Sequence, residues 1–367
     1  MNFSAVPVIM YHSVKYKRRQ NWVHPHITLE LNNFLKQLHL FNLLRVKTFF
    51  FDELYEHMKG LIKLPFNSIL LTFDDGYLDN FVFVFPLLKR YKLKATIWVN
   101  PDFVDNTNSQ IRPNLEDYWK DKITLEELNR IDGYLNWEEM RLMEKSGFVD
   151  IQSHTMSHAK YTISDKIIDF VHPETKIDWL YWNLFPEDRI NFLTNPRNKI
   201  PFGYPIYESD KGNIALKCEE DGSLTQALIN FVNENGKVEF FNNKDWKTQL
   251  FLMSESLKKN KGVFYRKETE EEYLARISFE LRESKRVIEK NLDKKINHVC
   301  WPYGGKNETL IKLAKEIGYL TSTGSSEKNI FGKKNYQQVN RISLDNTKYN
   351  NVLFYPYAMF KILSYKL

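Results

Sequence analysis

Short, almost wholly apolar runs alternate along the chain with longer segments whose apolar residues recur every three or four positions. The first pattern is typical of buried parallel strands and the second of amphipathic helices. Thr28 and Thr269 are predicted N-caps of two helices, and Asn136 with Glu139 forms the capping box of a third. The strand pattern predicts strands over residues 6–11, 68–73, 95–99, 148–152, 297–301 and 341–344.

This alternation predicts an α/β fold, because parallel neighbours in a sheet need a connection about as long as a helix. One region, from Tyr161 to about Glu268, lacks the alternation and is dense in Asn, Lys and aromatic residues. We interpret it as a long insertion between two elements of the core. A separate small domain is the alternative.

Composition excludes several classes of protein. Of the 367 residues, 43% are apolar and 27% are charged, as in folded globular chains. The net charge of +6 comes without a dense basic stripe, so we expect no nucleic-acid partner. Cys218 and Cys300 allow at most one disulfide. Because the sequence shows no signal peptide and no apolar run of about 18 residues, we expect a cytoplasmic protein. No oligomeric state is indicated.

Residues that carry chemistry follow four of the predicted strands. The carboxyl ends of parallel strands form the active-site edge of such folds. One polar side chain there would be unremarkable, but its recurrence at four strand ends predicts an active site. The groups are His12, the pair Asp74 and Asp75, His154 with His158, and the turn 301–304 (Trp-Pro-Tyr-Gly).

His154 and His158 lie four positions apart, a spacing that lets two imidazoles reach one metal ion. Alone, the pair is as compatible with ordinary surface or core histidines. Asp74 and Asp75 alone would be an Asp-Gly turn. Together, two imidazoles and a carboxylate leave positions open on a divalent ion, as catalytic sites do, while the second Asp is available as a base.

These segments resemble the first three motifs of the polysaccharide deacetylase family, also called carbohydrate esterase family four or the NodB-homology domain. The segment around His12 resembles the family's opening strand, and the one leading to His154 is also similar. The resemblance covers roughly residues 5–160 and 270–345. The three motifs are residues 72–77 (Thr-Phe-Asp-Asp-Gly-Tyr), 153–158 (Ser-His-Thr-Met-Ser-His) and 301–304 (Trp-Pro-Tyr-Gly).

The resemblance implies a distorted (β/α) barrel of about seven units, formed by residues 1–160 and 270–345 and interrupted by the insertion 161–269. It also implies a divalent metal ion, usually Zn²⁺, and removal of the N-acetyl group from an amino sugar. By motif position, Asp75, His154 and His158 would hold the metal ion and Asp74 would be the general base. The backbone N–H near Tyr303 would support the oxyanion.

The sequence departs from the family pattern at two positions. Cys300 stands where many members carry an arginine thought to orient the base. A C-terminal histidine that acts as general acid in many members is missing, since no histidine follows His298. His12 is our candidate for the vacant role or for a substrate contact, with a structural role as the alternative. Arg341 is expected to pair with Asp74 or another site carboxylate, or to form an ordinary structural ion pair.

Aromatic residues suggest where a substrate would bind. Trp301 and Tyr204 are candidate sugar-stacking residues, although Trp301 could equally pack in the barrel mouth, and the insertion's aromatic rings could equally form a core. The tail 346–367 mixes aromatic and basic residues and could contact a membrane surface peripherally. Expected substrates are N-acetylated sugars that are nucleotide-linked, lipid-linked or part of an oligosaccharide. Two alternatives remain open: hydrolysis of another C–N amide such as a cyclic ureide or imide, and a barrel that only binds glycan.

Overall fold

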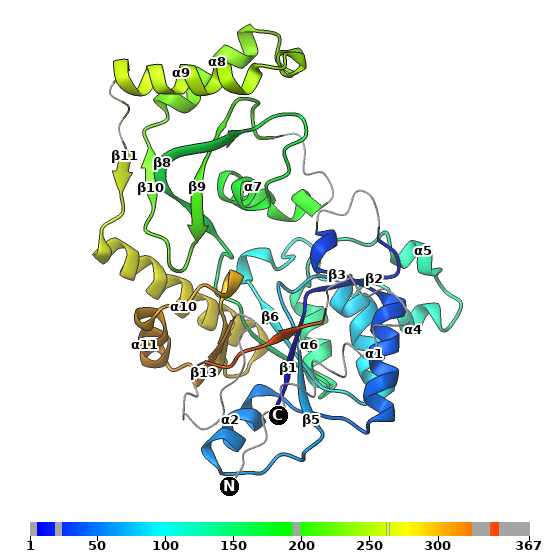
Figure 1. The fold of residues 1–367 in the computed structure, drawn as a ribbon. Coiled ribbons are helices and arrows are strands. Elements are labelled where there is room, and N and C mark those ends of the chain that lie inside the picture. The colour runs from blue at the N-terminus through cyan, green and yellow to red at the C-terminus, as the bar shows by residue number, and fades with distance from the viewer. Residues whose placement is uncertain are drawn as a thin grey trace. The chain divides into compact units, whose positions relative to one another are not determined.

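A computed structural model of the chain describes residues 6–18, 24–193, 199–261, 263, 265–324 and 338–344 (Figure 1). The chain divides into two compact units. The first comprises residues 1–158 and 279–367, and the second comprises residues 159–278. The aromatic and basic tail expected at 346–367 lies outside the described residues.

The first unit is built on a parallel sheet that curls into a half-barrel flanked by helices (Figure 1). Its strand order is β13-β12-β7-β6-β5-β1-β14, and β4 pairs with β5. This confirms the predicted α/β fold of barrel type. The strands are β1 (Val8–Tyr11), β4 (Lys47–Thr48), β5 (Ser68–Phe73), β6 (Ala95–Val99), β7 (Val149–Ser153), β12 (His298–Cys300), β13 (Thr321–Thr323) and β14 (Ile342–Ser343).

The central strands are buried along their whole length and mostly apolar, as is typical of a parallel sheet covered by helices. Every residue of β5 and β6 is buried, and Trp98 of β6 packs its ring edge-on against Phe51 of the first helix after β4. The helices of this unit are α1 (Leu31–Leu43), α2 (Phe51–Lys59), α3 (Phe85–Tyr91), α4 (Leu115–Tyr118), α5 (Leu125–Leu128), α6 (Trp137–Lys145), α11 (Glu308–Ile317) and the larger part of α10 (Glu270–Leu292).

Helix boundaries follow the predicted caps with one exception. The capping box at Asn136 and the cap at Thr269 are present. Thr28, however, is not an N-cap: it lies in β3 (Thr28–Glu30), which pairs with β2 (Ser13–Lys15), and its hydroxyl donates to the His24 carbonyl. A β-branched residue is well suited to that strand. The helix begins three residues later, at Leu31.

In its described residues the second unit contains two antiparallel strand pairs, three complete α-helices and the start of α10. Strand β8 (Lys160–Phe170) pairs with β9 (Pro205–Lys211), and β10 (Cys218–Glu220) pairs with β11 (Tyr265–Lys267). The helices are α7 (Asp178–Leu184), α8 (Ser223–Glu234) and α9 (Trp246–Lys261). Of the helices in the described part of the chain, none has the length and apolarity that crossing a bilayer requires.

Many aromatic rings of the second unit serve its own core. Phe170 and Tyr207 belong to a buried cluster with leucines of α8, and Trp179, Phe202 and Tyr204 pack against a smaller cluster around Ile206. This supports the core-forming alternative for these rings.

Candidate active site

The strand order of the first unit brings the predicted site residues together. Strands β1, β5, β6, β7 and β12 are consecutive neighbours in the sheet, so the residues that follow them share its carboxyl edge. Asp75 follows β5, and its Oδ1 lies 3.3 Å from Nε2 of His154 and 3.2 Å from Nε2 of His158, both of which follow β7. Side chains from two strand ends therefore converge on one point.

The two ring nitrogens of His154 have different partners. Its Nδ1 lies 2.8 Å from the Cys300 carbonyl oxygen, which can only accept, so the proton is on Nδ1. When the imidazole is neutral, Nε2 carries a lone pair and faces a carboxylate oxygen of Asp75 at 3.3 Å, and when it is protonated, Nε2 donates to that oxygen. In the absence of a metal ion the protonated form is favoured: burial lowers the pKa of His154, but contacts with Cys300, Asp75 and Asp74 outweigh burial and raise the pKa well above its usual value. Two acceptors so placed repel one another unless a cation or a shared proton lies between them.

A divalent metal ion fits this set of donors. Zn²⁺ binds imidazole nitrogen and carboxylate oxygen at roughly 2.0–2.2 Å, so two ligand atoms of a tetrahedral site lie about 3.3 Å apart. The observed separations of 3.2 and 3.3 Å match this value. The Cys300 carbonyl that accepts from His154 also fixes the tautomer that a metal ligand needs.

Backbone strain accompanies this convergence. Asp75, Thr155 and His158 all have positive φ values, of 72°, 63° and 49°, which residues with a side chain rarely adopt. Such strain persists only where surrounding contacts impose it, and it is common at functional sites. Gly76 is required beside Asp75, since it also has a positive φ and an added Cβ would lie 3.0 Å from Val99 Cγ1.

Asp74 is held by an arginine. Arg341, just before β14, donates from Nη1 to Asp74 Oδ1 at 2.6 Å and from Nη2 to Asp74 Oδ2 at 2.8 Å, and both side chains are buried. Burial alone would raise the pKa of Asp74, but the Arg341 charge and hydrogen bonds outweigh it and hold the pKa below its usual value. Asp74 is therefore an ionised carboxylate with a fixed orientation.

Comparison with known proteins identifies the family. Residues 62–178 and 259–322 match the family model described as polysaccharide deacetylase. This chain belongs to the polysaccharide deacetylase family. Over 90 residues it is 30% identical to the Bacillus subtilis protein YxkH, whose name places it among polysaccharide deacetylases. That match covers 24% of this chain and only about a quarter (23%) of the relative.

Two solved structures show that the fold is shared along most of the chain. A de-N-acetylase from Aggregatibacter actinomycetemcomitans superposes with a TM-score of 0.58 at 18% identity, covering 99% of both chains. The BpsB deacetylase domain from Bordetella bronchiseptica superposes with a TM-score of 0.55 at 17% identity, covering 93% of this chain and 96% of that one.

The structure shows what surrounds Cys300, the residue expected to stand where many family members carry an arginine. Cys300 Sγ lies 3.0 Å from Arg341 Nη2 and 3.8 Å from Asp74 Oδ2, so the small side chain leaves room for Arg341. Of the alternatives that the sequence left open for Arg341, the structure shows the pairing with Asp74. No periodicity in the sequence could have revealed it, because 267 positions separate the two residues.

His12 lies at the same site. Its Nε2 is 3.8 Å from Asp74 Oδ2, and its side chain is 16% exposed, so it is accessible from solvent. Two buried residues at the start of the helix after β5 fix the turn that carries it. Asn80 donates to the His12 carbonyl at 2.9 Å, and Asp79 accepts from Ser13 Oγ at 2.6 Å and from the Val14 N–H at 3.1 Å. Asp79 and Asn80 are not among the site residues predicted from the sequence. Two polar residues at the start of an otherwise apolar helix could have indicated that they hold a neighbouring segment.

Of the three aromatic residues predicted to contribute to the site, the structure places one beside His158. Tyr303 has a positive φ of 53°, is 36% exposed, and its ring centroid lies 4.5 Å from that of His158, which places it at the site. Trp301 is 1% exposed, which favours packing over sugar stacking.

Tyr204 lies in the second unit and packs against its core, and its role with a substrate stays a prediction. His298, on β12, is buried, and its two ring nitrogens lie 2.8 Å from Thr321 Oγ1 and 2.9 Å from Asp52 Oδ1.

Proposed function

We propose that this chain is a metal-dependent hydrolase that removes the N-acetyl group from an amino sugar in a glycan or glycan precursor. The convergence of Asp75, His154 and His158 beside an ionised Asp74 carries the proposal. Family membership supports the class of substrate, and the two structural relatives named above are themselves deacetylases.

Asp75, His154 and His158 would hold the metal ion, and Asp74 would act as general base. A bound divalent ion such as Zn²⁺ would polarise the amide carbonyl and acidify a water molecule at the site. Asp74 then takes the proton of the attacking water, a task for which it must be ionised and correctly oriented. Arg341 secures both conditions through its two hydrogen bonds.

Two further groups complete the proposed mechanism. The backbone N–H near Tyr303 would stabilise the oxyanion that forms when the carbonyl is attacked. His12, close to Asp74 and accessible from solvent, would donate a proton to the departing amine. It would thereby replace the C-terminal histidine that this chain lacks. Acetate and a free amino sugar are the products.

The test combines metal content with acetate release from a panel of N-acetylated sugars. We expect His154→Ala and Asp75→Ala to lose the metal ion and activity together. Asp74→Asn should retain the metal ion and lose turnover by about 10²–10⁴-fold, the usual contribution of a general base. The matched control is His298→Gln, which replaces a buried histidine on the neighbouring strand β12 and should retain metal.

Two outcomes would contradict the proposal. If His154→Ala bound metal as the parent does, the ligand assignment would be wrong. If the parent bound metal but released no acetate from any N-acetylated sugar, the substrate class would be wrong, and cyclic ureides and imides would be the next substrates to test.

A further inference from the structure

The segment between the two site histidines is held by one carboxylate. Glu280, on α10, accepts hydrogen bonds through Oε2 from the backbone N–H groups of Met156 and Ser157, each at 3.0 Å. Its Oε1 accepts from the Ser157 hydroxyl at 2.6 Å. One side chain thus satisfies three donors within two consecutive residues.

This segment needs external support. It consists of the three residues between His154 and His158. Its first residue, Thr155, and the residue that follows it, His158, both have positive φ values. Backbone of this kind is strained, and relaxation at either residue would redirect the His158 side chain. The convergence on Asp75 therefore depends on whatever holds the backbone between the two histidines.

Helix α10 supplies a second contact to the same loop. Ser284, one turn after Glu280 and on the same helix face, lies 2.7 Å from Ser153 Oγ. Ser153 Oγ in turn accepts from the Thr155 N–H at 3.2 Å. From the other side, Asn100 donates to the His154 carbonyl and, at 3.3 Å, to the Thr155 carbonyl. Of these contacts, Glu280 contributes the charged one and the largest number of bonds.

We propose that Glu280 is a positioning residue for the metal site, holding the backbone of Met156 and Ser157 so that His154 and His158 converge on Asp75. The inference rests on the proposed metal-binding function. Groups that orient metal ligands without touching the metal contribute about 10–100-fold to metal affinity, and Glu280 acts on the loop that carries two ligands.

The test measures the Zn²⁺ dissociation constant by competition with a chromophoric chelator. Glu280→Ala removes all three hydrogen bonds and should weaken Zn²⁺ binding about 10–100-fold. Glu280→Gln should stay within about threefold of the parent, because its carbonyl oxygen can accept both N–H groups while its amide donates to the Ser157 hydroxyl. Ser157→Ala removes a single bond, and its effect should fall between the two.

Glu144→Ala is the matched control. Glu144, on α6, also accepts a backbone N–H from the strand that leads to the histidines, that of Ile151 at 2.5 Å, but it does not bind the loop. This variant should lose thermal stability without losing Zn²⁺ affinity. Thermal unfolding of each metal-free variant identifies the temperatures at which all are folded, and the absorption spectrum of bound Co²⁺ reports the ligand geometry directly.

The outcomes separate this inference from the proposed function. If the parent and Glu280→Ala bind Zn²⁺ equally well and give the same Co²⁺ spectrum, Glu280 positions nothing, while the metal site itself stands. If Glu144→Ala weakens Zn²⁺ binding as much as Glu280→Ala does, the effect is one of general stability and the inference is wrong. If the parent binds no metal ion, both proposals fail. Should Glu280→Ala not fold, Ser157→Ala decides, and parent-like affinity in it would overturn the inference.

Discussion

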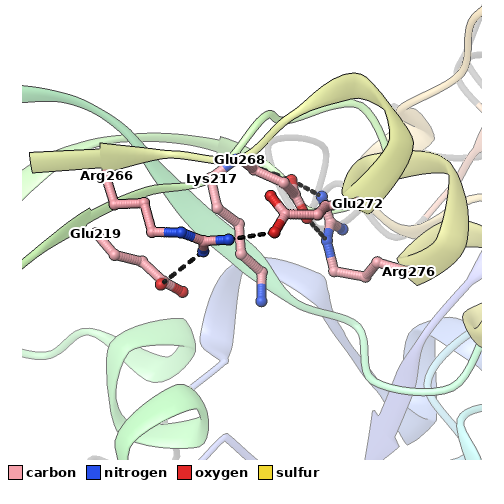
Figure 2. A pocket seen from close by; sticks show the side chains of 6 residues that line it. All are labelled: Lys217, Glu219, Arg266, Glu268, Glu272 and Arg276. Carbon is pink, nitrogen blue, oxygen red and sulfur yellow. Dashed lines mark hydrogen bonds and ion pairs between the residues drawn. The ribbon is translucent and has the colours of Figure 1, made fainter.

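Each of the two units holds a cluster of ionisable side chains, and the two clusters are arranged in opposite ways. In the second unit, three cations and three carboxylates line a cavity of about 260 Å³. Figure 2 shows them pairing across it: Arg276 with Glu268 at 2.7 Å, and Arg266 with both Glu219 and Glu272. In the first unit, by contrast, one carboxylate oxygen of Asp75 faces a ring nitrogen of His154 and one of His158, and these three residues include no lysine or arginine.

The difference indicates which cluster binds a ligand. Where every carboxylate has a cationic partner, the cluster has satisfied its charges internally and stabilises the fold around it. Where a carboxylate and two imidazoles converge on one point, a divalent cation can take the place of the imidazole protons, as the proposed function requires. The first cluster also contains the strained backbone of Asp75 and His158. This contrast supports the proposal that the first cluster carries the chemistry and that the second is structural.

Replacing Arg341 should produce the largest effect, because it removes the guanidinium that donates hydrogen bonds to both carboxylate oxygens of Asp74. Arg341→Met leaves a buried carboxylate uncompensated, which typically costs about 3–5 kcal/mol of unfolding free energy. Burial then raises the pKa of Asp74, so the acidic limb of the pH–rate profile should move to higher pH and turnover should fall. Chemical denaturation and a pH profile of acetate release measure the two effects.

Arg276→Met is the control for Arg341→Met in the second cluster. Its partner Glu268 is also largely buried, and Arg276 further donates to the carbonyls of Gly212 and Ala215. We expect a loss of stability without a shift of the pH–rate profile. If both variants changed only stability, the distinction between the clusters would fail.

Much of the fold and of the site could be predicted from the sequence because the information is local. A buried strand is visible as a mostly apolar run. Such runs are followed directly by the pair Asp74 and Asp75 and closely by His154 and His158. The structure brings these residues together because parallel strands share a carboxyl edge. Strand β13 was missed because Thr321–Thr323 is neither long nor apolar.

The supporting contacts could not be predicted because they join distant segments. Glu280 is separated from Ser157 by 123 positions. Helix α10 contains several other glutamates, and nothing in the sequence distinguishes Glu280 from them. Arg341 and Asp74 are separated by 267 positions, and the sequence offered their pairing only as one of several alternatives. The packing of helices and strands decides which of many charged residues meets the site, and no pattern along the chain encodes that choice.

His12 tests whether the first cluster does more than bind a metal ion. His12→Ala should lower turnover by about 10²-fold, the lower end for a general acid, while metal content stays that of the parent. His12→Gln distinguishes proton donation from hydrogen bonding, since glutamine can donate a bond but not a proton. Unchanged kinetics in His12→Ala would remove it from the mechanism and leave it a structural residue at the site.

The smallest expected effect concerns Glu268 in the second cluster. Burial alone would raise its pKa, but hydrogen bonds from Arg276 and from the Lys217 N–H, together with their charges, hold its pKa below the usual value. A carboxyl whose pKa is lower in the folded state stabilises the protein above its unfolded-state pKa of about 4.3, and this contribution is lost as the pH falls through the folded value. Glu268→Gln should therefore be less stable than the parent by about 1 kcal/mol at pH 7.

That difference should shrink when unfolding is measured at successively lower pH below about 4.3, where the parent carboxylate also becomes neutral. Acetate release at pH 7 should be that of the parent, since an internally balanced cluster supplies no group to the reaction. A loss of turnover in Glu268→Gln larger than its loss of stability would show that the paired cluster also contributes to function, and the contrast between the two units would then have to be abandoned.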